Sequence, residues 1–348
     1  MKMDIDELYM RRCLQLAANG LGRVRPNPLV GCVVVKDGKI ISEGFHQEYG
    51  HNHAERNALL RLAPSSDLRP PTSDLTLYVN LEPCSHYGKT PPCADLIIEK
   101  GIKRVVCCND DPNPLVAGNG FRKLEEAGIE VVRHVLEEEG RELNRRFFTF
   151  MEKKRPYVIL KWAQSEDGYM APCLGGHQDI KTSRHQDHGL QLEVSKSRSL
   201  EVSKQYWLST QRQNRLNHRW RTEEAAILVG SETYLLDHPS LTARHYLGLQ
   251  PQPVVLDRRG RIGEMAEGRR GISPLILQSQ TIPEVLQKLY EAKMQSVIVE
   301  GGRKILDAFI ASGLYDEVRI LRSPQTLGSG LKAPAIPPIA SNRLTIID

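Results

Sequence analysis

Hydrophobic and polar residues in the first half of the chain alternate with periods that predict a sheet covered by helices. Residues 6–19 carry apolar side chains at helical spacing and end in Asn19-Gly20, a common helix stop. The apolar runs 30–35 and 39–43 flank Lys36-Asp-Gly38, which predicts a β-hairpin. Further helices are expected over 54–62 and 93–101, and further strands over 75–79 and 104–108.

The second half begins after a charged, helix-prone segment over 137–154, which Arg155-Pro156 ends before a strand starts at Tyr157. We therefore expect a domain boundary near residue 150, with domains over 1–150 and 151–348. Short apolar runs with helix-like segments between them follow over 225–229, 254–256, 275–277, 296–299 and 318–321. This alternation favours an α/β nucleotide-binding layer.

Composition narrows the class of protein. The 348 residues are 40% hydrophobic and 26% charged, which is enough to bury two ordinary cores. No apolar run approaches the roughly 20 residues needed to cross a bilayer, so we expect a soluble, cytoplasmic protein with no membrane partner. The seven cysteines are typical of reduced thiols and metal ligands. The net charge of +5 is spread along the chain, which suits phosphorylated small molecules as well as nucleic acid.

A candidate zinc site stands in the first half. His53-Ala-Glu55 precedes Cys84 by about thirty residues, and Cys93 follows. One imidazole and two thiolates leave zinc a fourth position, where water can ionise near neutral pH and attack an electrophilic carbon. Glu55 can take the proton of that water and return it to the ring nitrogen and the departing ammonia, as in known zinc deaminases. The spacing therefore predicts a hydrolytic deaminase with Glu55 as its proton shuttle.

Two other interpretations of these residues remain open at this level. A structural zinc site normally has four protein ligands, and His46, His51 or His86 could supply the fourth. The cysteines could also be buried without any metal. The remaining cysteines of this half lie on apolar faces and are expected in the core: Cys13, Cys32, Cys107 and Cys108.

Three motifs resemble one family. The two cysteines of Cys84-Ser-His-Tyr-Gly-Lys-Thr-Pro-Pro-Cys93 are separated by eight residues, where deaminases usually have two. With Pro26-Asn-Pro-Leu-Val-Gly31 and Asp111-Pro-Asn-Pro-Leu-Val-Ala-Gly118, this pattern resembles the bifunctional deaminase/reductase family of riboflavin biosynthesis over nearly the whole chain. The resemblance implies an α/β protein in which an N-terminal cytidine-deaminase-like three-layer domain precedes a dihydrofolate-reductase-like α/β domain.

The same resemblance implies a reaction and a set of contacts for the first domain. The deaminase would remove the 2-amino group of a phosphoribosylamino-diaminopyrimidinone, in a protein expected to form homo-oligomers. Its substrate-binding residues would be Asn27, His46, His86 and Lys89. Taken alone, Asn27 is equally typical of a turn and Lys89 of a solvated charge.

In the second half no Gly-x-Gly-x-x-Gly fingerprint is present. Glu300-Gly-Gly302 is the best substitute, because it follows a predicted strand and precedes a predicted helix over 304–310 whose backbone N–H groups could meet a pyrophosphate. A glycine pair in that position is also typical of an ordinary turn.

The family resemblance extends to Lys161-Trp-Ala-Gln-Ser-Glu-Asp-Gly168, Ile227-Leu-Val-Gly230 and Pro239-Ser-Leu-Thr-Ala-Arg244. It implies reduction of the ribosyl group to ribityl with NADPH. The implied cofactor-binding residues are Lys161, Gln164, Trp207, Thr233, Asp237 and Gly302, and the implied substrate-binding residues are Arg221, Leu241, Arg244 and Glu300. The arginines suit a phosphate.

The chain departs from the family pattern in its second half. A polar segment over 173–204 repeats Leu-Glu-Val-Ser-Lys and replaces a short connection, Gln205 stands where a small serine is typical, and His238 replaces an acidic or amide residue. The sequence also ends early, which predicts an exposed sheet edge. An impaired reductase is therefore one alternative, beside a deaminase acting on nucleic acid, which the 6% aromatic content and the wide cysteine spacing disfavour, and a non-catalytic zinc scaffold, which Glu55 disfavours.

Overall fold

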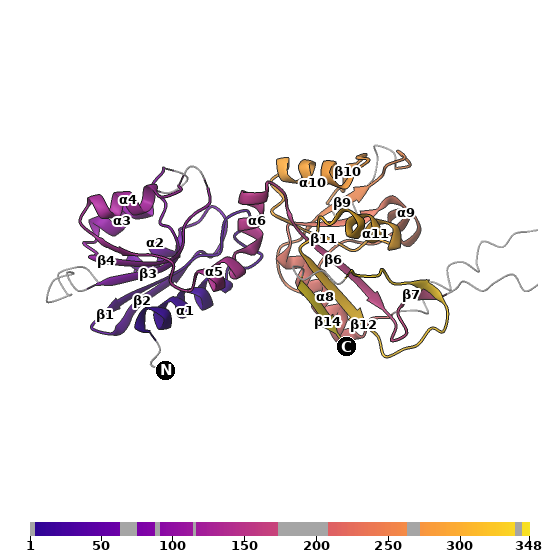
Figure 1. Cartoon of the computed structure of the whole chain (residues 1–348), viewed down its shortest axis with the longest axis horizontal. Helices are drawn as coiled ribbons and strands as arrows, with labels where there is room; N and C mark the ends of the chain where they lie inside the picture. Colours follow the sequence, from indigo (N-terminus) through magenta and orange to yellow (C-terminus); the bar gives the residue numbers. More distant parts are fainter. Residues whose placement is uncertain are drawn as a thin grey trace, which may run out of the picture.

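The computed structural model describes residues 4–62, 75–87, 91–113, 116–172, 208–262, 272–337 and 343–348. Figure 1 shows two lobes with helix α6 between them. The predicted insertion over 173–204, with Gln205, lies outside the described residues. In the described part of the chain, no helix is long and apolar enough to span a membrane.

The first lobe contains a five-stranded mixed sheet in the order β2-β1-β3-β4-β5. Its elements are α1 (Ile5–Ala18), β1 (Gly31–Lys36), β2 (Lys39–Phe45), α2 (Ala54–Leu59), β3 (Thr76–Leu81), α3 (Cys93–Glu99), β4 (Arg104–Asn109), α4 (Asn119–Glu126), β5 (Glu130–Val132), α5 (Glu137–Leu143) and α6 (Arg145–Lys153). The hairpin expected around Lys36-Asp-Gly38 is confirmed as β1 and β2, which pair antiparallel.

Side chains of this sheet alternate between two helical layers, because successive residues of a strand point to opposite faces. Cys32 and Val34 of β1 pack with helices α2, α3 and α4, whereas Val33 and Val35 of the same strand pack with α1. The three-layer architecture expected for the first domain is therefore confirmed.

The second lobe is built on a seven-stranded sheet in the order β10-β9-β8-β11-β6-β12-β14, and every neighbouring pair in it is parallel. Its elements are β6 (Tyr157–Gln164), β7 (Tyr169–Pro172), α8 (Gln211–Glu223), β8 (Ala226–Gly230), α9 (Ser231–Asp237), β9 (Gln252–Leu256), β10 (Leu275–Leu277), α10 (Ile282–Glu291), β11 (Ser296–Val299), α11 (Arg303–Ser312), β12 (Glu317–Arg322), β13 (Gly330–Lys332) and β14 (Arg343–Ile347).

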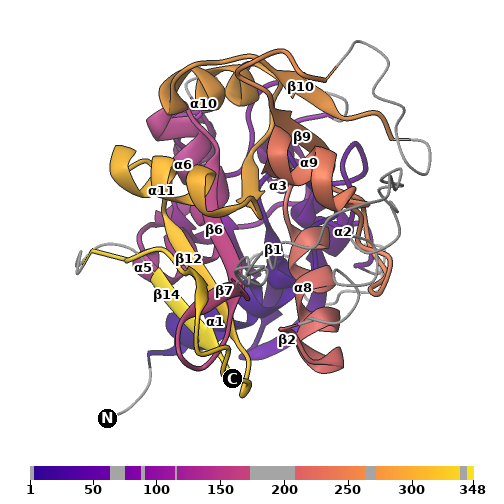
Figure 2. The ribbon, with the colours of Figure 1, turned by 90° about the vertical axis from the view of Figure 1, so that its right-hand side faces the viewer.

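Both faces of this sheet are covered, as parallel sheets require. One core cluster joins Leu160, Leu228 and Val299 to Leu286 of α10 and Phe309 of α11. A second cluster on the opposite face joins other strand residues to Trp220 of α8. Figure 2 shows α10 and α11 on one side of the strands and α8 on the other. The α/β layer expected for the second half is confirmed.

The helix-prone segment over 137–154 is helical, as expected, and forms two helices, α5 and α6, with a break at Asn144. The Asn144 side chain is engaged by another part of the chain: its Oδ1 accepts from the Leu29 backbone N–H at 2.8 Å, and its Nδ2 donates to the Leu29 carbonyl at 2.9 Å. Asn144 has φ −96° and ψ 20°, outside the α-helical region. The long-range pairing with Leu29 therefore coincides with the break in a charged segment that looks continuous in sequence.

The two lobes are joined by buried polar contacts. Arg146 of α6 forms a bidentate ion pair with Glu224 of the second lobe, with donor–acceptor distances of 2.9 and 2.5 Å. Burial alone would raise the pKa of Glu224, but Arg146 and Arg319 outweigh it and lower this pKa to about 2. Glu224 is therefore a fully charged group inside the interface and depends on its partners.

Candidate functional site

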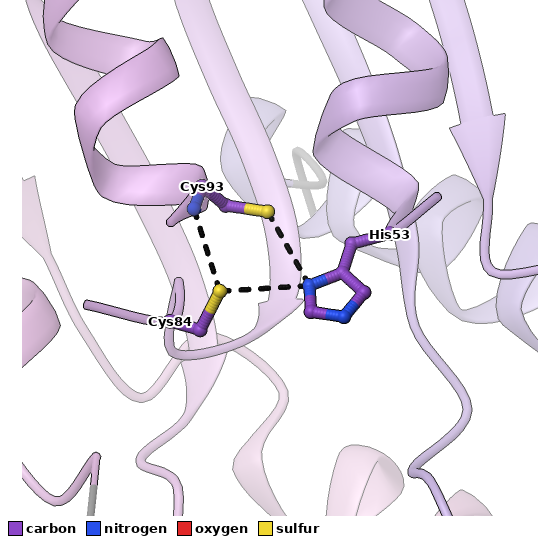
Figure 3. Close-up of side chains that lie close together, drawn as sticks. All are labelled: His53, Cys84 and Cys93. Atoms are coloured by element: carbon purple, nitrogen blue, oxygen red, sulfur yellow. Dashed lines mark hydrogen bonds between the residues drawn. The ribbon is translucent and has the colours of Figure 1, made fainter. Parts of the chain in front are cut away.

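Three separate elements bring the predicted metal ligands together. His53 precedes α2 as its N-cap, Cys84 follows β3, and Cys93 is the first residue of α3. Figure 3 shows the three side chains converging on one point from these elements. His53 Nδ1 lies 3.5 Å from the Sγ atoms of both Cys84 and Cys93.

These distances fit a zinc ion. Zn–S bonds of about 2.3 Å and a Zn–N bond of about 2.0 Å at tetrahedral angles place nitrogen and sulfur about 3.5 Å apart. All three ligand atoms lie within 4.8 Å of one another, and in the described part of the chain no fourth His, Cys, Asp or Glu joins them. Of the alternative fourth ligands, His46 is buried and contacts Asn27, and His51 and His86 are exposed. The arrangement supports three protein ligands and one open position, as in catalytic zinc sites.

The surroundings favour the thiolate form of Cys84. Hydrogen bonding to Cys93 lowers the pKa of Cys84 to about 4, and His53 adds to this effect. The Cys93 backbone N–H donates to the Cys84 Sγ at 3.3 Å. A thiolate is the species that binds metal, so Cys84 is ready to bind a cation, whereas the same hydrogen bond raises the pKa of the Cys93 thiol well above its usual value.

Glu55 lies in the first turn of α2, two residues after the ligand His53. Its side chain is 3% exposed and lines the same cavity as His53 and Cys84. Burial raises the pKa of Glu55 to about 7. A carboxyl group with a pKa near neutrality can both accept and return a proton, which suits a general acid and base.

The cavity beside the cluster has a volume of about 350 Å³ and contains the predicted residues Asn27, His46 and His86. His46 Nδ1 faces the Asn52 carbonyl at 3.0 Å, and its Nε2 faces the Asn27 Nδ2 at 3.1 Å. A carbonyl can only accept, so Nδ1 carries the proton and Nε2 accepts from Asn27. Burial lowers the pKa of His46, which keeps this imidazole neutral.

Asp111 and Asn113 belong to a family motif but were not predicted as site residues, and both line this cavity. Burial raises the pKa of Asp111 to about 7, and its Oδ1 accepts from the Asn113 backbone at 2.8 Å. Glu82 holds this loop by accepting from the backbone N–H groups of Asp111, Gly118 and Gly120. The sequence feature that could have identified them is their position directly after the buried strand β4, where α/β proteins often bind ligands.

The other predicted residues of this half have mixed outcomes. Lys89 lies outside the described residues. Cys13, Cys32, Cys107 and Cys108 are each 0% exposed, which confirms that they belong to the core.

In the second lobe a cavity of about 600 Å³ opens at the carboxyl ends of β8, β9 and β11. It contains the predicted residues Thr233, Asp237 and Gly302. Gly302 is the N-cap of α11, and its N–H donates to the Thr233 Oγ1 at 3.2 Å. The predicted order of strand, Glu300-Gly-Gly302 and helix is confirmed.

Five cationic side chains line this cavity and were not identified from the sequence: Arg258, Arg259, Arg261, Arg303 and Lys304. Arg261 donates to the Ser231 Oγ at 2.8 Å, and Lys304 lies 3.1 Å from Glu232. Together with the first turn of α11, they make the cavity suitable for an anionic ligand such as a phosphorylated dinucleotide.

A buried charge cluster lies at the end of β11. Glu300 accepts two bonds of 2.8 Å from Arg221 and lies 3.4 Å from Lys161 Nζ and from Asn217 Nδ2. Burial alone would raise the pKa of Glu300, but Arg221 and Lys161 outweigh it and hold this pKa well below its usual range. One carboxylate faces two cations, so the cluster carries a net positive charge.

The remaining predicted residues of this half surround that cluster or lie elsewhere. Leu241 is buried and precedes Thr242, whose carbonyl accepts from Arg221 at 2.8 Å. Arg244 is exposed, Gln164 accepts from Trp162 Nε1 at 2.7 Å, and Trp207 lies outside the described residues. Lys161, expected beside the cofactor, contacts Glu300 of the expected substrate set, so its cofactor contact stays a prediction.

Each half of the chain is similar to a known protein family. The family model of the RibD C-terminal domain matches residues 156–345, and that of the cytidine and deoxycytidylate deaminase zinc-binding region matches residues 3–109. Riboflavin biosynthesis protein RibD of Aquifex aeolicus is 37% identical, over 94% of this chain and 89% of the relative. RibD of Escherichia coli strain K12 is 34% identical, over 93% of this chain and 89% of the relative.

Solved structures show the same likeness in three dimensions. RibD of Acinetobacter baumannii superposes with a TM-score of 0.79 at 33% identity, covering 94% of this chain and 89% of the neighbour. A diaminohydroxyphosphoribosylaminopyrimidine deaminase/5-amino-6-(5-phosphoribosylamino)uracil reductase of Thermotoga maritima gives a TM-score of 0.75 at 38% identity, with the same coverage. The chain therefore belongs to the RibD family of riboflavin biosynthesis, which joins a zinc-dependent deaminase to an NADPH-dependent reductase.

Proposed function

We propose that this chain hydrolytically removes the 2-amino group of 2,5-diamino-6-(5-phosphoribosylamino)pyrimidin-4-one and then reduces the ribosyl side chain of the product to ribityl. The observation that carries the first step is the zinc-spaced cluster of His53, Cys84 and Cys93 beside the buried Glu55. Fold and family support the second step.

In the deamination, His53, Cys84 and Cys93 would hold the metal. Zinc, when bound there, supplies a Lewis acid that makes water nucleophilic at neutral pH. Glu55 would accept one proton from the attacking water and deliver it to the ring nitrogen, and would then move the second proton from the new C–OH group to the amino group, which leaves as ammonia. Glu55 is buried in the same cavity as His53 and Cys84, which puts its carboxyl group beside the metal position. Asn27, fixed by the neutral His46, presents its remaining amide atoms to the pyrimidine edge.

In the reduction, NADPH supplies the hydride when it is bound in the cavity at the ends of β8, β9 and β11. Thr233 and Gly302 line this cavity at the first turn of α11 and would hold the pyrophosphate of the cofactor. The Glu300 cluster holds the sugar phosphate of the substrate, because the two positive charges of Arg221 and Lys161 outnumber the one negative charge of the Glu300 carboxylate.

The arginines at the end of β9 indicate why the cofactor is NADPH. Arg258 and Arg259 directly follow the strand residue Leu256 and Asp257, and with Arg261 they line the same cavity. Planar guanidinium groups bind phosphate through paired hydrogen bonds, so they can select the extra 2′-phosphate of NADPH over NADH.

One coupled assay tests both steps. Purified protein is incubated with the phosphoribosylamino-diaminopyrimidinone while released ammonia is measured, and NADPH is then added and its oxidation followed in the same sample. Ammonia followed by NADPH consumption is expected. Ammonia without NADPH oxidation would contradict the reductase half, and the absence of both would contradict the whole proposal. Assembly as a homo-oligomer, a cytoplasmic location and the absence of nucleic-acid binding stay predictions.

A further inference from the structure

The segment that carries Asn27 into the deaminase cavity is anchored on the other lobe. The Arg25 guanidinium donates three hydrogen bonds to backbone carbonyls there: to Thr222 at 3.0 Å, to Glu224 at 2.7 Å and to Gln250 at 2.9 Å. Thr222 and Glu224 stand at the carboxyl end of α8. The last carbonyls of a helix have no partner within the helix, and a cation at this end is favourable. Arg25 thus caps a helix of the second domain.

A second side chain of that domain holds the next residue. Gln295, which is 6% exposed and directly precedes β11, donates from Nε2 to the Pro26 carbonyl at 2.9 Å. We call Arg25 and Gln295 the interdomain bracket. On the far side of Asn27, the backbone of Leu29 is fixed within the first lobe by the Asn144 side chain. Asn27 therefore lies between one anchor from each lobe.

We propose that the second domain completes the deaminase site of the first, with Arg25 and Gln295 acting as positioning residues for Asn27. The bracket acts on the two residues that directly precede Asn27 in the chain. It fixes the backbone from which the Asn27 amide reaches both the cavity and the His46 Nε2 at 3.1 Å. Holding a binding group in place before the substrate arrives lowers the entropic cost of binding.

The helix that receives Arg25 also serves the reductase cluster. Arg221, one residue before Thr222, binds both oxygens of Glu300. Backbone contact at this point is close, because a Cβ added at Gly22 would lie 2.6 Å from the Thr222 carbonyl oxygen, and Gly22 has φ +81°. Arg25 binds the backbone carbonyls at this end of α8, whereas Arg221 reaches the reductase cluster through its own side chain, so the two sets of contacts are separate.

Steady-state kinetics of two variants test this inference in the full-length, zinc-loaded protein. Arg25→Ala is expected to raise the deaminase KM about 10-fold and Gln295→Ala about 3-fold, each with kcat within about 2-fold, because one charged and one neutral anchor are lost. Reductase KM values and zinc content should stay at the wild-type level. Arg25→Lys should recover part of the loss, since one ammonium can reach some of the carbonyls.

Matched controls come from exposed positions nearby. Arg23→Ala removes an arginine from the same segment, and Gln287→Ala removes a glutamine of α10 whose bond is to Glu291 within its own helix. Neither should change the deaminase KM. An unchanged KM in both Arg25→Ala and Gln295→Ala would overturn the inference, as would a parallel fall in deaminase and reductase kcat in both variants.

The kinetic test rests on the proposed deaminase reaction, because it needs the substrate. Hydrogen exchange at the Asn27 amide tests the bracket without any substrate. The Asn27 N–H donates to the Val24 carbonyl at 2.8 Å, and we expect its exchange to accelerate at least about 5-fold in both bracket variants. Unchanged exchange at Asn27 would refute the bracket whatever substrate the protein uses. Faster exchange in a protein that releases no ammonia would support the bracket and refute the proposed deaminase substrate.

Discussion

The zinc cluster draws all its ligands from residues 53–93, whereas the second cavity is lined by residues between 230 and 331. The first site has three ligand atoms at metal-compatible distances, set by the starts of two helices and the end of one strand. The second is a broad opening across the ends of three parallel strands. A metal site thus demands a few residue types at fixed spacing, while a dinucleotide cavity is shaped by topology and accepts many sequences.

The largest effect should come from the proton shuttle. Glu55→Gln removes the group that accepts and returns the proton, so we expect deaminase kcat to fall about 10³-fold or more. NADPH oxidation with the deaminated substrate should continue at the wild-type rate. The two assays run on one preparation, with zinc content as the control. A variant that retains wild-type deaminase activity would show that Glu55 is not the proton shuttle.

The next effect concerns the ion pair that joins the two lobes, outside both sites. Arg146→Ala leaves Glu224 charged and buried, which should cost about 3–5 kcal/mol in the free energy of unfolding. Denaturant titration followed by fluorescence measures this loss. An exposed pair provides the control, since Arg141→Ala breaks a contact with Glu152 and should cost less than about 1 kcal/mol. Equal losses would show that burial of the ion pair is unimportant.

The same pair gives a pH dependence with a definite sign. The pKa of Glu224 is lowered to about 2 in the folded protein from an ordinary value of 4.5. The folded state therefore gains stability from the charged carboxylate above pH 4.5, and this gain disappears as the pH falls toward 2. The difference in unfolding free energy between wild type and Glu224→Gln should shrink over that interval. A difference that stays constant with pH would contradict the assignment.

A smaller effect tests the second cavity. Removing Arg258 and Arg259 together should raise the KM for NADPH about 10-fold or more, because charge-assisted bonds to the 2′-phosphate are lost. The KM for NADH should change little, and deamination not at all. Arg322→Ala, an arginine outside the cavity, serves as the control. If both cofactors lose affinity equally, these arginines do not recognise the 2′-phosphate.

The smallest effect distinguishes core cysteines from ligands. Cys107→Ala should cost about 1 kcal/mol in unfolding free energy and leave one zinc per chain, whereas Cys84→Ala should abolish zinc binding. Metal analysis of the purified variants decides the matter. Loss of zinc from Cys107→Ala would mean that the ligand set is wrong.

The contrast between the sites also explains what the sequence could predict. His53, Cys84 and Cys93 were identifiable because zinc restricts both ligand type and geometry. Strands such as β1 and β11 were identifiable because buried strands are nearly continuous apolar runs. Arg258 and Arg259 were missed because surface arginines acquire a role only when the sheet brings β9 beside β8. The break at Asn144 was missed because it coincides with a bond to Leu29, 115 positions away.

The strand order of the second sheet also constrains how the chain is made. β6 is the first strand of its sheet in the sequence, yet it pairs with β11 and β12. Val158 therefore cannot pair until Val297 has been synthesised, and Leu160 cannot pair with β12 until Val318 has been synthesised. During synthesis the first domain can close its core while β6 still has no neighbour. Pairing between distant segments is slow, and an unpaired apolar strand is prone to aggregation. We therefore expect the nascent second domain to be the stage at which chaperones matter most for this chain.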